Sequence, residues 1–129
     1  MAEADNIRVL IVDSEPSVRD GLAEFLDDYG FETGRCGSAQ EARDLMREAP
    51  VDVCIVSLRL PGFSGEELIA LAHKHFPEQK YIIHTTALAY ELPEKMVAIG
   101  IRPEHIFHKP ISELNVLVKT IKVLAGHPE

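Results

Sequence analysis

Six polar side chains of this sequence lie at or just after the ends of four apolar segments that have the length of a β-strand: Asp13, Ser14, Glu15, Ser57, Thr86 and Lys109. Carboxylates, hydroxyls and a lysine are the groups with which proteins hold phosphoryl groups and metal ions. Taken singly, each of these residues is better interpreted as a polar position at a loop boundary. A common site is therefore predicted only if the fold brings the ends of these four segments together.

The segment 52–65, DVCIVSLRLPGFSG, is the centre of this prediction. Its run of apolar and β-branched residues predicts a strand that is buried on both faces and that ends at Ser57. Pro61, Gly62 and Gly65 then predict a loop that leads into an amphipathic helix. In an open α/β sheet, ligands bind where strands end, so Ser57 occupies the position of greatest interest.

The rest of the chain alternates strand-like and helix-like segments five times. The predicted strands cover 7–12, 31–36, 53–57, 80–86 and 105–108, and the predicted helices cover 16–29, 39–49, 65–76, 93–99 and 112–125. This alternation predicts a parallel sheet with right-handed crossovers and helices on both faces. We expect one domain over residues 1–129, with a flavodoxin-like (βα)5 three-layer fold and strand order 2-1-3-4-5.

Helix boundaries are marked by local signals. Pro16 fits a first helical turn, and Gly30 is typical of a residue that ends a helix. Ser38 and Glu41 have the spacing of a capping box, in which each side chain bonds a backbone N–H of the other residue. The more polar segment 31–36 is expected at an edge of the sheet.

Composition excludes several classes of function. The 129 residues include 21 acidic and 13 basic side chains, a formal net charge of −8, which argues against binding of nucleic acid by this domain. No apolar run reaches the ~20 residues of a membrane span. Cys36 and Cys54 lack metal or redox spacing, so they are interpreted as buried, reduced thiols of a cytoplasmic protein.

The chain resembles the receiver domain of two-component response regulators over nearly its full length. The resemblance is carried by VLIVDSEPSVR, by SLRLPGFSGEEL, by Thr86-Ala87 and by Lys109-Pro110. It implies that strand three ends at a phosphoacceptor position and that acids after strand one hold Mg²⁺. It also implies that Thr86 and Lys109 contact phosphoryl oxygens, and that the Lys109–Pro110 peptide bond is cis.

Three positions depart from the family pattern. The phosphoacceptor aspartate is replaced by Ser57, the second acidic position is Ser14, and the aromatic switch position is Ile106. Glu15 does not obviously replace the missing acid. The chain therefore resembles a degenerate receiver, or pseudo-receiver, with no enzymatic activity.

The substitutions remove chemistry that phosphotransfer requires. A carboxylate is already ionised at neutral pH, whereas a serine hydroxyl must first lose its proton. Mg²⁺ prefers anionic oxygen ligands, and the family's three carboxylates are reduced to Asp13, so Mg²⁺ binding is expected to be weak or absent and no metal site is predicted. With fewer acids present, Asp13 and Lys109 are expected to pair one to one.

Partners are predicted from the second half of the chain. Val116 and Val123 lie opposite the apolar stripe of the last helix, and Tyr90 and Ile106 are expected nearby. The resemblance implies an interface formed by strands and helices four and five. Candidate partners are a histidine kinase, another regulator, an effector domain or a second copy of the chain.

Other interpretations of the sequence remain open. A flavodoxin-like domain that binds a small molecule or nucleotide is the alternative function, although no G-x-G-x-x-G or P-loop follows the first strand. Modification of Ser57 by a serine kinase is a further alternative. His84 is expected to be a hydrogen-bonded core histidine, and the six histidines are not expected to bind a metal.

Overall fold

The computed structural model describes residues 7–126, so residues 1–6 and 127–129 of the predicted domain lie outside the described residues. All strand pairs in the sheet are parallel. The sheet has the order β2-β1-β3-β4-β5, with bounds β1 Arg8–Val12, β2 Glu32–Cys36, β3 Val53–Ser57, β4 Lys80–Thr85 and β5 Ile106–His108. The predicted flavodoxin-like topology is confirmed, and β2 lies at an edge as expected.

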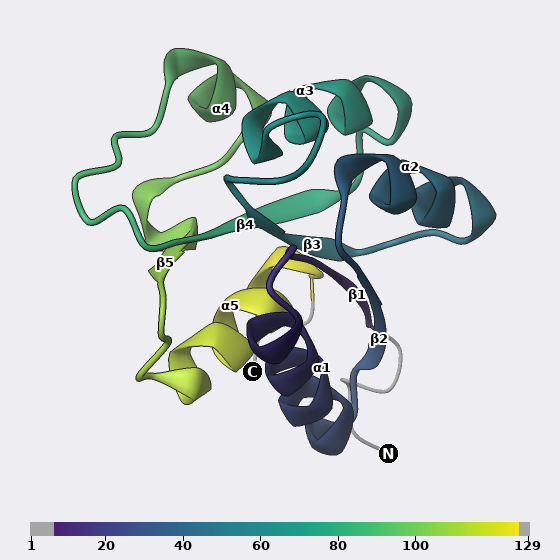
Figure 1. The fold of residues 1–129 in the computed structure, drawn as a ribbon, viewed down its shortest axis with the longest axis vertical. Coiled ribbons are helices and arrows are strands. Elements are labelled where there is room, and N and C mark those ends of the chain that lie inside the picture. The colour runs from purple at the N-terminus through teal and green to yellow at the C-terminus, as the bar shows by residue number, and fades with distance from the viewer. Residues whose placement is uncertain (1–6, 127–129) are drawn as a thin grey trace.

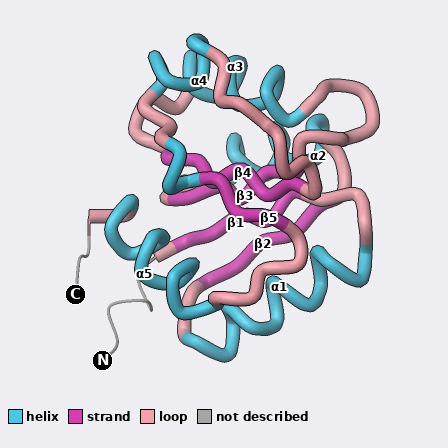
Figure 2. The backbone as a smooth tube through the Cα atoms, turned by 90° about the vertical axis from the view of Figure 1, so that its left-hand side faces the viewer, coloured by secondary structure: helices cyan, strands magenta, loops and turns pink. Residues whose placement is uncertain are grey.

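Helices cover both faces of this sheet (Figures 1 and 2). Their bounds are α1 Pro16–Tyr29, α2 Ala39–Glu48, α3 Gly65–His75, α4 Glu94–Ile99 and α5 Leu114–Leu124, with a short 3₁₀ turn, η2, at Pro103–His105. In Figure 1, α2, α3 and α4 lie above the sheet, and α1 and α5 lie below it. The three predicted layers are therefore present.

The alternation of side chains along β3 divides the core between the two layers. Val53 and Ile55 pack with α1 and α5, whereas Cys54 and Val56 pack with the helices of the opposite layer. All five residues of β3 are buried. Because burying an aliphatic side chain contributes about 1.5–3 kcal/mol, this strand is firmly anchored up to Ser57.

Helix α1 ends as its sequence predicts, but the predicted capping box of α2 is only half formed. Gly30 adopts the left-handed conformation with φ 116°, which favours glycine. The Ser38 hydroxyl accepts a hydrogen bond from Glu41 N, but the Glu41 carboxylate accepts from Gly37 N instead of Ser38 N. The glutamate thus bonds one residue before the helix cap.

A complete capping box lies at α3, where the sequence analysis did not identify one. The Ser64 hydroxyl accepts from Glu67 N, and the Glu67 carboxylate accepts from Ser64 N. The signal was present as Ser64 followed three residues later by Glu67. This cap sets the first turn of α3 beside the end of β3.

No helix in the described part of the chain is both long and apolar enough to cross a bilayer.

Candidate functional site

The carboxyl ends of four strands surround a polar cavity of about 520 Å³, which we call the strand-end cavity. Its walls contain all six predicted polar residues: Asp13, Ser14, Glu15, Ser57, Thr86 and Lys109, together with Leu58, Arg59, Thr85 and Ala87. The parallel topology explains this convergence, since every strand delivers its last residue to the same edge of the sheet. The predicted grouping of these residues is therefore observed.

Ser57 lies at the floor of the strand-end cavity and is only 5% exposed. The chain returns closely to it, because Gly65 N donates a 2.9 Å hydrogen bond to the carbonyl of Leu58. A Cβ atom at Gly65 would overlap the carbonyl oxygen of Ser57. Only glycine therefore allows the start of α3 to approach the end of β3 so closely.

Lys109 joins the polar groups of the cavity. Its Nζ lies 2.8 Å from Asp13 Oδ2 and 3.1 Å from Glu15 Oε1, and it donates a 3.3 Å hydrogen bond to Ser57 Oγ. The lysine side chain is 9% exposed. The expected one-to-one pair with Asp13 is wrong, since Glu15 reaches the same ammonium group. The predicted cis peptide bond between Lys109 and Pro110 is present.

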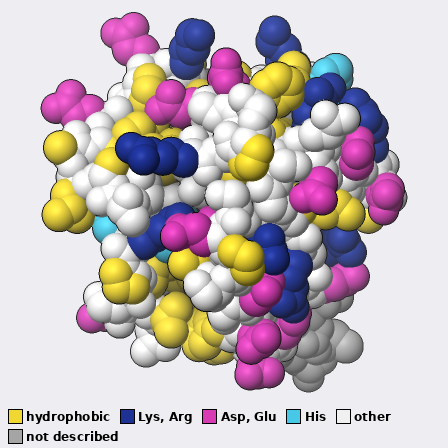
Figure 3. All heavy atoms as spheres, viewed as in Figure 1, with side chains coloured by type: hydrophobic (Ala, Val, Ile, Leu, Met, Phe, Trp, Pro, Cys, Tyr) yellow, Lys and Arg dark blue, Asp and Glu magenta, His cyan; other side chains and the backbone are white. Residues whose placement is uncertain are grey.

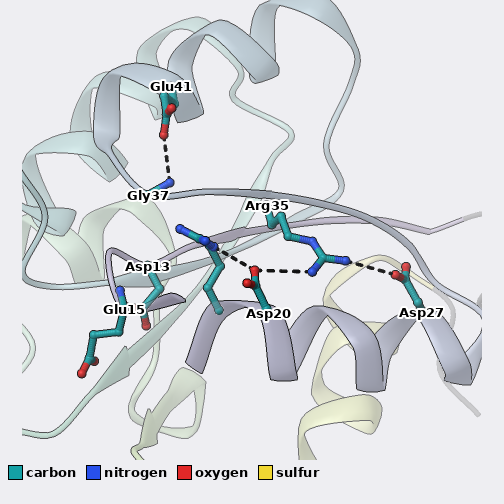
Figure 4. A network of polar contacts seen from close by, with 8 residues as sticks. Asp13, Glu15, Asp20, Asp27, Arg35, Gly37 and Glu41 are labelled. Atoms are coloured by element: carbon teal, nitrogen blue, oxygen red, sulfur yellow. Dashed lines mark hydrogen bonds and ion pairs between the residues drawn. The ribbon is translucent and has the colours of Figure 1, made fainter. Parts of the chain in front are cut away.

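Asp13 is held in place by the turn that follows β1. Its Oδ1 accepts a 3.0 Å hydrogen bond from Glu15 N, a local bond that aspartate commonly makes in turns. Its Oδ2 forms the close charge contact with Lys109, at an angle outside hydrogen-bond geometry. In Figure 4, Asp13 and Glu15 lie beside a row of ion pairs in which Arg35 contacts Asp20 and Asp27.

The donor set of the strand-end cavity fits Mg²⁺ poorly. Among residues 7–126, no three His, Cys, Asp or Glu side chains are grouped to hold a metal ion. Asp13 supplies the buried carboxylate, and that carboxylate already contacts Lys109. Ser14 and Ser57 present neutral hydroxyls, which are weaker ligands for a hard divalent cation.

Strand β4 ends one residue earlier than predicted, at Thr85. Thr85 is 5% exposed, and its hydroxyl accepts a 3.1 Å hydrogen bond from Ala87 N. Thr86 lies beyond the strand, is exposed and lines the strand-end cavity. Thr85 was not among the predicted site residues, although two adjacent threonines at the end of a strand indicate that one faces the protein and the other the solvent.

His84 is buried in β4, as predicted, but the expected hydrogen bond is wrong. It is 4% exposed, and its Nε2 has no hydrogen-bond partner among the described residues. Its pKa is lowered to about 4, chiefly by burial and secondly by the charge of Lys109, whereas Asp13 and Glu15 act in the opposite direction. The imidazole is therefore neutral at physiological pH.

The predicted interface residues differ in exposure. Val116 and Val123 are 47% and 60% exposed on α5. Ile106 and Tyr90 are half-buried, and the Tyr90 hydroxyl donates a hydrogen bond to Glu66 Oε2 of α3. The α5 valines are therefore the more accessible members of this set, and a role for any of the four in an interface stays a prediction.

Comparisons with known proteins agree with this geometry. A family model described as the response regulator receiver domain matches residues 9–122. The chain is 30% identical over 120 residues to response regulator RR06 of Streptococcus pneumoniae serotype 2 (strain D39), covering 92% of this chain and 52% of that protein. It is 34% identical over 121 residues to the transcriptional regulatory protein BtsR of Escherichia coli (strain K12), covering 89% and 46%.

A solved structure shows the same architecture. Response regulator protein TrrA from Thermotoga maritima, solved in complex with Mg²⁺-BeF, superposes with a TM-score of 0.78 at 25% identity, covering 92% of this chain and 98% of that one. The chain spans about half the length of the two curated relatives above.

Proposed function

The chain belongs to the response regulator receiver domain family, and we propose that it acts in two-component signalling as a binding module that forms no aspartyl phosphate. The observation that carries this proposal is Ser57 at the end of β3. Its Oγ accepts a hydrogen bond from Lys109, so the hydroxyl lies beside an ammonium group that stabilises anions. Serine cannot provide the ionised carboxylate from which an aspartyl phosphate is built.

Among the described residues, no general base is hydrogen-bonded to this serine. Within residues 7–126, the Ser57 hydroxyl has no hydrogen bond to a histidine or a carboxylate, and the carboxylates nearest to Lys109 are committed to its charge. Deprotonating Ser57 would require a base to accept the proton, although Lys109 lies close enough to offset the developing charge. The small number of acids in the cavity supports weak or absent Mg²⁺ binding, and we propose a non-enzymatic role in the cytoplasm.

Four apolar side chains that are exposed on α4, α5 and the loop before α4 support a protein partner. They are Leu88, Val97, Val116 and Val123, which are 82%, 56%, 47% and 60% exposed. We propose that these four side chains contribute to one interaction surface, which we call the apolar surface. The partner that we propose is a histidine kinase, another regulator, an effector domain or a second copy of this chain, with no role for nucleic acid or membrane.

The alternative of a nucleotide-binding domain has less support. Nucleotide phosphates are usually held by successive backbone N–H groups of a glycine-rich turn. In this chain Glu15 N, in the turn between β1 and α1, is already bonded to Asp13 Oδ1. The excess of acidic residues would further oppose a polyphosphate.

Phosphoryl transfer is tested with acetyl phosphate and Mg²⁺, followed by intact-mass measurement. The wild-type chain is expected to gain no phosphate, and beryllofluoride is expected to leave its amide spectrum unchanged. The double variant Ser14→Asp, Ser57→Asp is the matched control, because it restores two carboxylates to the same scaffold. A phosphate on wild-type Ser57, or beryllofluoride-induced shifts at the ends of β1, β3 and β4, would contradict the proposal.

The apolar surface is tested separately by introducing charged side chains into it. Val116→Asp and Val123→Asp are expected to weaken self-association measured by light scattering, or capture of the partner from a native lysate. Phe63→Asp is the control, because Phe63 is also exposed but lies in the loop before α3. Equal loss in all three variants would mean that the α5 valines have no specific role.

A further inference from the structure

A groove of about 300 Å³ lies between α2 and α3, and we call it the α2/α3 groove. Four apolar side chains, two arginines and His75 line it, and no acidic side chain does. The chain as a whole has 21 acidic and 13 basic side chains. In Figure 3, basic side chains and a histidine lie together at the upper right, in the region where Figure 1 shows α2 and the adjoining part of α3. The groove is therefore basic in a chain whose net charge is strongly negative.

The two arginines of the groove share one face of α2. Arg43 and Arg47 are four residues apart, a spacing that makes side chains neighbours on a helix surface. Arg47 contacts Asp44 at 3.2 Å, but these side chains are 60% and 57% exposed, and an exposed ion pair contributes little. Its guanidinium has donors left for a second carboxylate. Within residues 7–126, Arg43 has no ion pair, and its guanidinium lies 5.8 Å from the centre of the Phe63 ring.

The apolar side chains of the groove come from both sides. Met46 of α2 and Ala72 of α3 are buried, at 2% and 3% exposed, and belong to the same part of the core. Leu71 of α3 and Phe76, which follows α3, are only half-buried. The groove thus offers apolar surface that an inserted side chain can cover, next to two arginines that can pair with carboxylates.

We propose that the α2/α3 groove binds an acidic segment of a partner protein that carries a bulky apolar side chain. Its carboxylates pair with Arg43 and Arg47, and its apolar side chain packs against Leu71 and Phe76. Charge complementarity selects this occupant. Nucleic acid or an anionic membrane requires a broader basic surface, and the net charge of −8 would repel either of them.

The α2/α3 groove is distinct from the apolar surface proposed above. In Figure 1, α3 lies between α2 and α4, so the groove and the apolar surface lie on opposite sides of α3. None of the residues that line the groove also lines the strand-end cavity. The binding proposed for the groove therefore requires neither Ser57 nor phosphoryl chemistry.

Three capped heptapeptides test the chemistry of the groove in amide NMR titrations of the full chain. EELFEEL carries acidic and apolar side chains, QQLFQQL lacks the charges, and EESSEES lacks the apolar side chains. EELFEEL is expected to cause saturable shifts at α2 and α3, and each of the other two is expected to bind at least about fivefold more weakly. Raising the salt concentration to about 1 M, where the Debye length is about 3 Å, is expected to weaken EELFEEL binding by a similar factor.

Paired substitutions locate the binding. Arg43→Gln, Arg47→Gln is expected to weaken EELFEEL binding about fivefold, since glutamine removes both charges and remains a good helix former. Lys95→Gln, Lys119→Gln is the matched control, because it changes the net charge equally at two exposed lysines of α4 and α5. Leu71→Ala is expected to weaken binding of EELFEEL but not of EESSEES. Thermal unfolding shows whether each variant is folded.

Each contrary result overturns the proposal. Without saturable shifts at α2 and α3, EELFEEL does not bind in the groove. If EESSEES bound as tightly as EELFEEL, the groove would attract any anion, and if QQLFQQL did so, the arginines would not select the ligand. Equal loss in the two double variants would trace the effect to net charge alone. All of these measurements are made without phosphate donors, so they test the groove separately from the proposed function.

Discussion

A mainly apolar cavity of about 430 Å³ lies between α1 and the start of α5, and we call it the α1/α5 cavity. Lys109 lines both this cavity and the strand-end cavity, but the two differ in whether their buried polar atoms have partners. In the strand-end cavity, Ser57 has a partner in Lys109, and the lysine charge is balanced by Asp13 and Glu15. In the α1/α5 cavity, His84 has no partner for Nε2 in the described chain. Ser57 and His84 are nevertheless direct neighbours across β3 and β4.

The difference arises from what each side chain faces. Ser57 meets the polar loops at the strand ends, where Lys109 can reach it, whereas His84 lies under the apolar helices α1 and α5. The packing beside the two cavities differs as well, because Gly65 is packed against Ser57 of the strand-end cavity, while Gly21 of the α1/α5 cavity has open space beside it. The polar groups of the strand-end cavity therefore contact one another next to closely packed backbone, whereas the α1/α5 cavity is open beside Gly21 and includes a buried nitrogen without a partner in the described chain.

The largest expected effect is at Gly65, whose backbone is packed against Ser57 of the strand-end cavity. Gly65→Ala is expected to lower the free energy of unfolding by about 3 kcal/mol, because its Cβ must displace the backbone of Ser57 and Leu58. Gly21→Ala is the matched control and is expected to stabilise by about 0.5–1 kcal/mol, since it removes a helical glycine without a clash. Urea unfolding measures the change in free energy of unfolding for each variant, and similar changes in the two would contradict the difference in packing between the two glycines.

Titration of His84 sharpens the comparison through pH. Its folded-state pKa is about 4, below the ordinary value of 6.5, so protonation favours the unfolded state. The part of the free energy of unfolding that depends on a neutral His84 is fully present above pH 6.5 and is lost as the pH falls toward 4. Between neutral pH and about pH 4.5 the loss amounts to about 2–3 kcal/mol.

The measurement compares urea unfolding of wild type and His84→Leu at both pH values. Loss of stability from the other titrating groups is common to the two proteins, so the difference isolates His84. A pH dependence that is the same in both would mean that His84 gains a partner or solvent when protonated.

Removing the buried acid of the strand-end cavity is expected to have a somewhat smaller effect. Asp13→Asn leaves Lys109 with Glu15 alone. The free energy of unfolding is expected to fall by about 2 kcal/mol, which is less than the cost of a fully broken buried ion pair. Glu15→Gln is the control, at about 0.5 kcal/mol, because the Glu15 side chain is 61% exposed. Thermal unfolding of the two variants would contradict this ranking if Glu15→Gln were the more damaging.

The smallest expected effect is that of Mg²⁺. Millimolar Mg²⁺ is predicted to raise the melting temperature of the wild type by less than about 2 °C, since a weakly bound ion adds little stability. Ser14→Asp, Ser57→Asp should show a larger rise, because two carboxylates join Asp13. A clear rise in the wild type would show that the strand-end cavity binds the ion without them.

Local sequence patterns were sufficient to predict the helices and strands and to predict that the polar residues at the strand ends lie together. Alternating apolar strands and amphipathic helices predicted the sheet order, and the position of each polar residue after a strand predicted the strand-end cavity. These inferences succeed because side-chain periodicity and parallel topology are properties of the chain order itself. The position of Ser57 at the end of β3 was likewise predicted from residue type and position.

Only the tertiary structure decided which partner each polar atom finds. The second carboxylate at Lys109, the bond from Glu41 to Gly37, and the unpaired Nε2 of His84 all depend on distances between segments that are not encoded in spacing. The α1/α5 cavity depends on how closely two helices pack over one strand. The sequence thus determined the fold and the positions of the polar residues at the strand ends, while packing decided which buried charges and polar groups are compensated, because compensation is a matter of contact geometry.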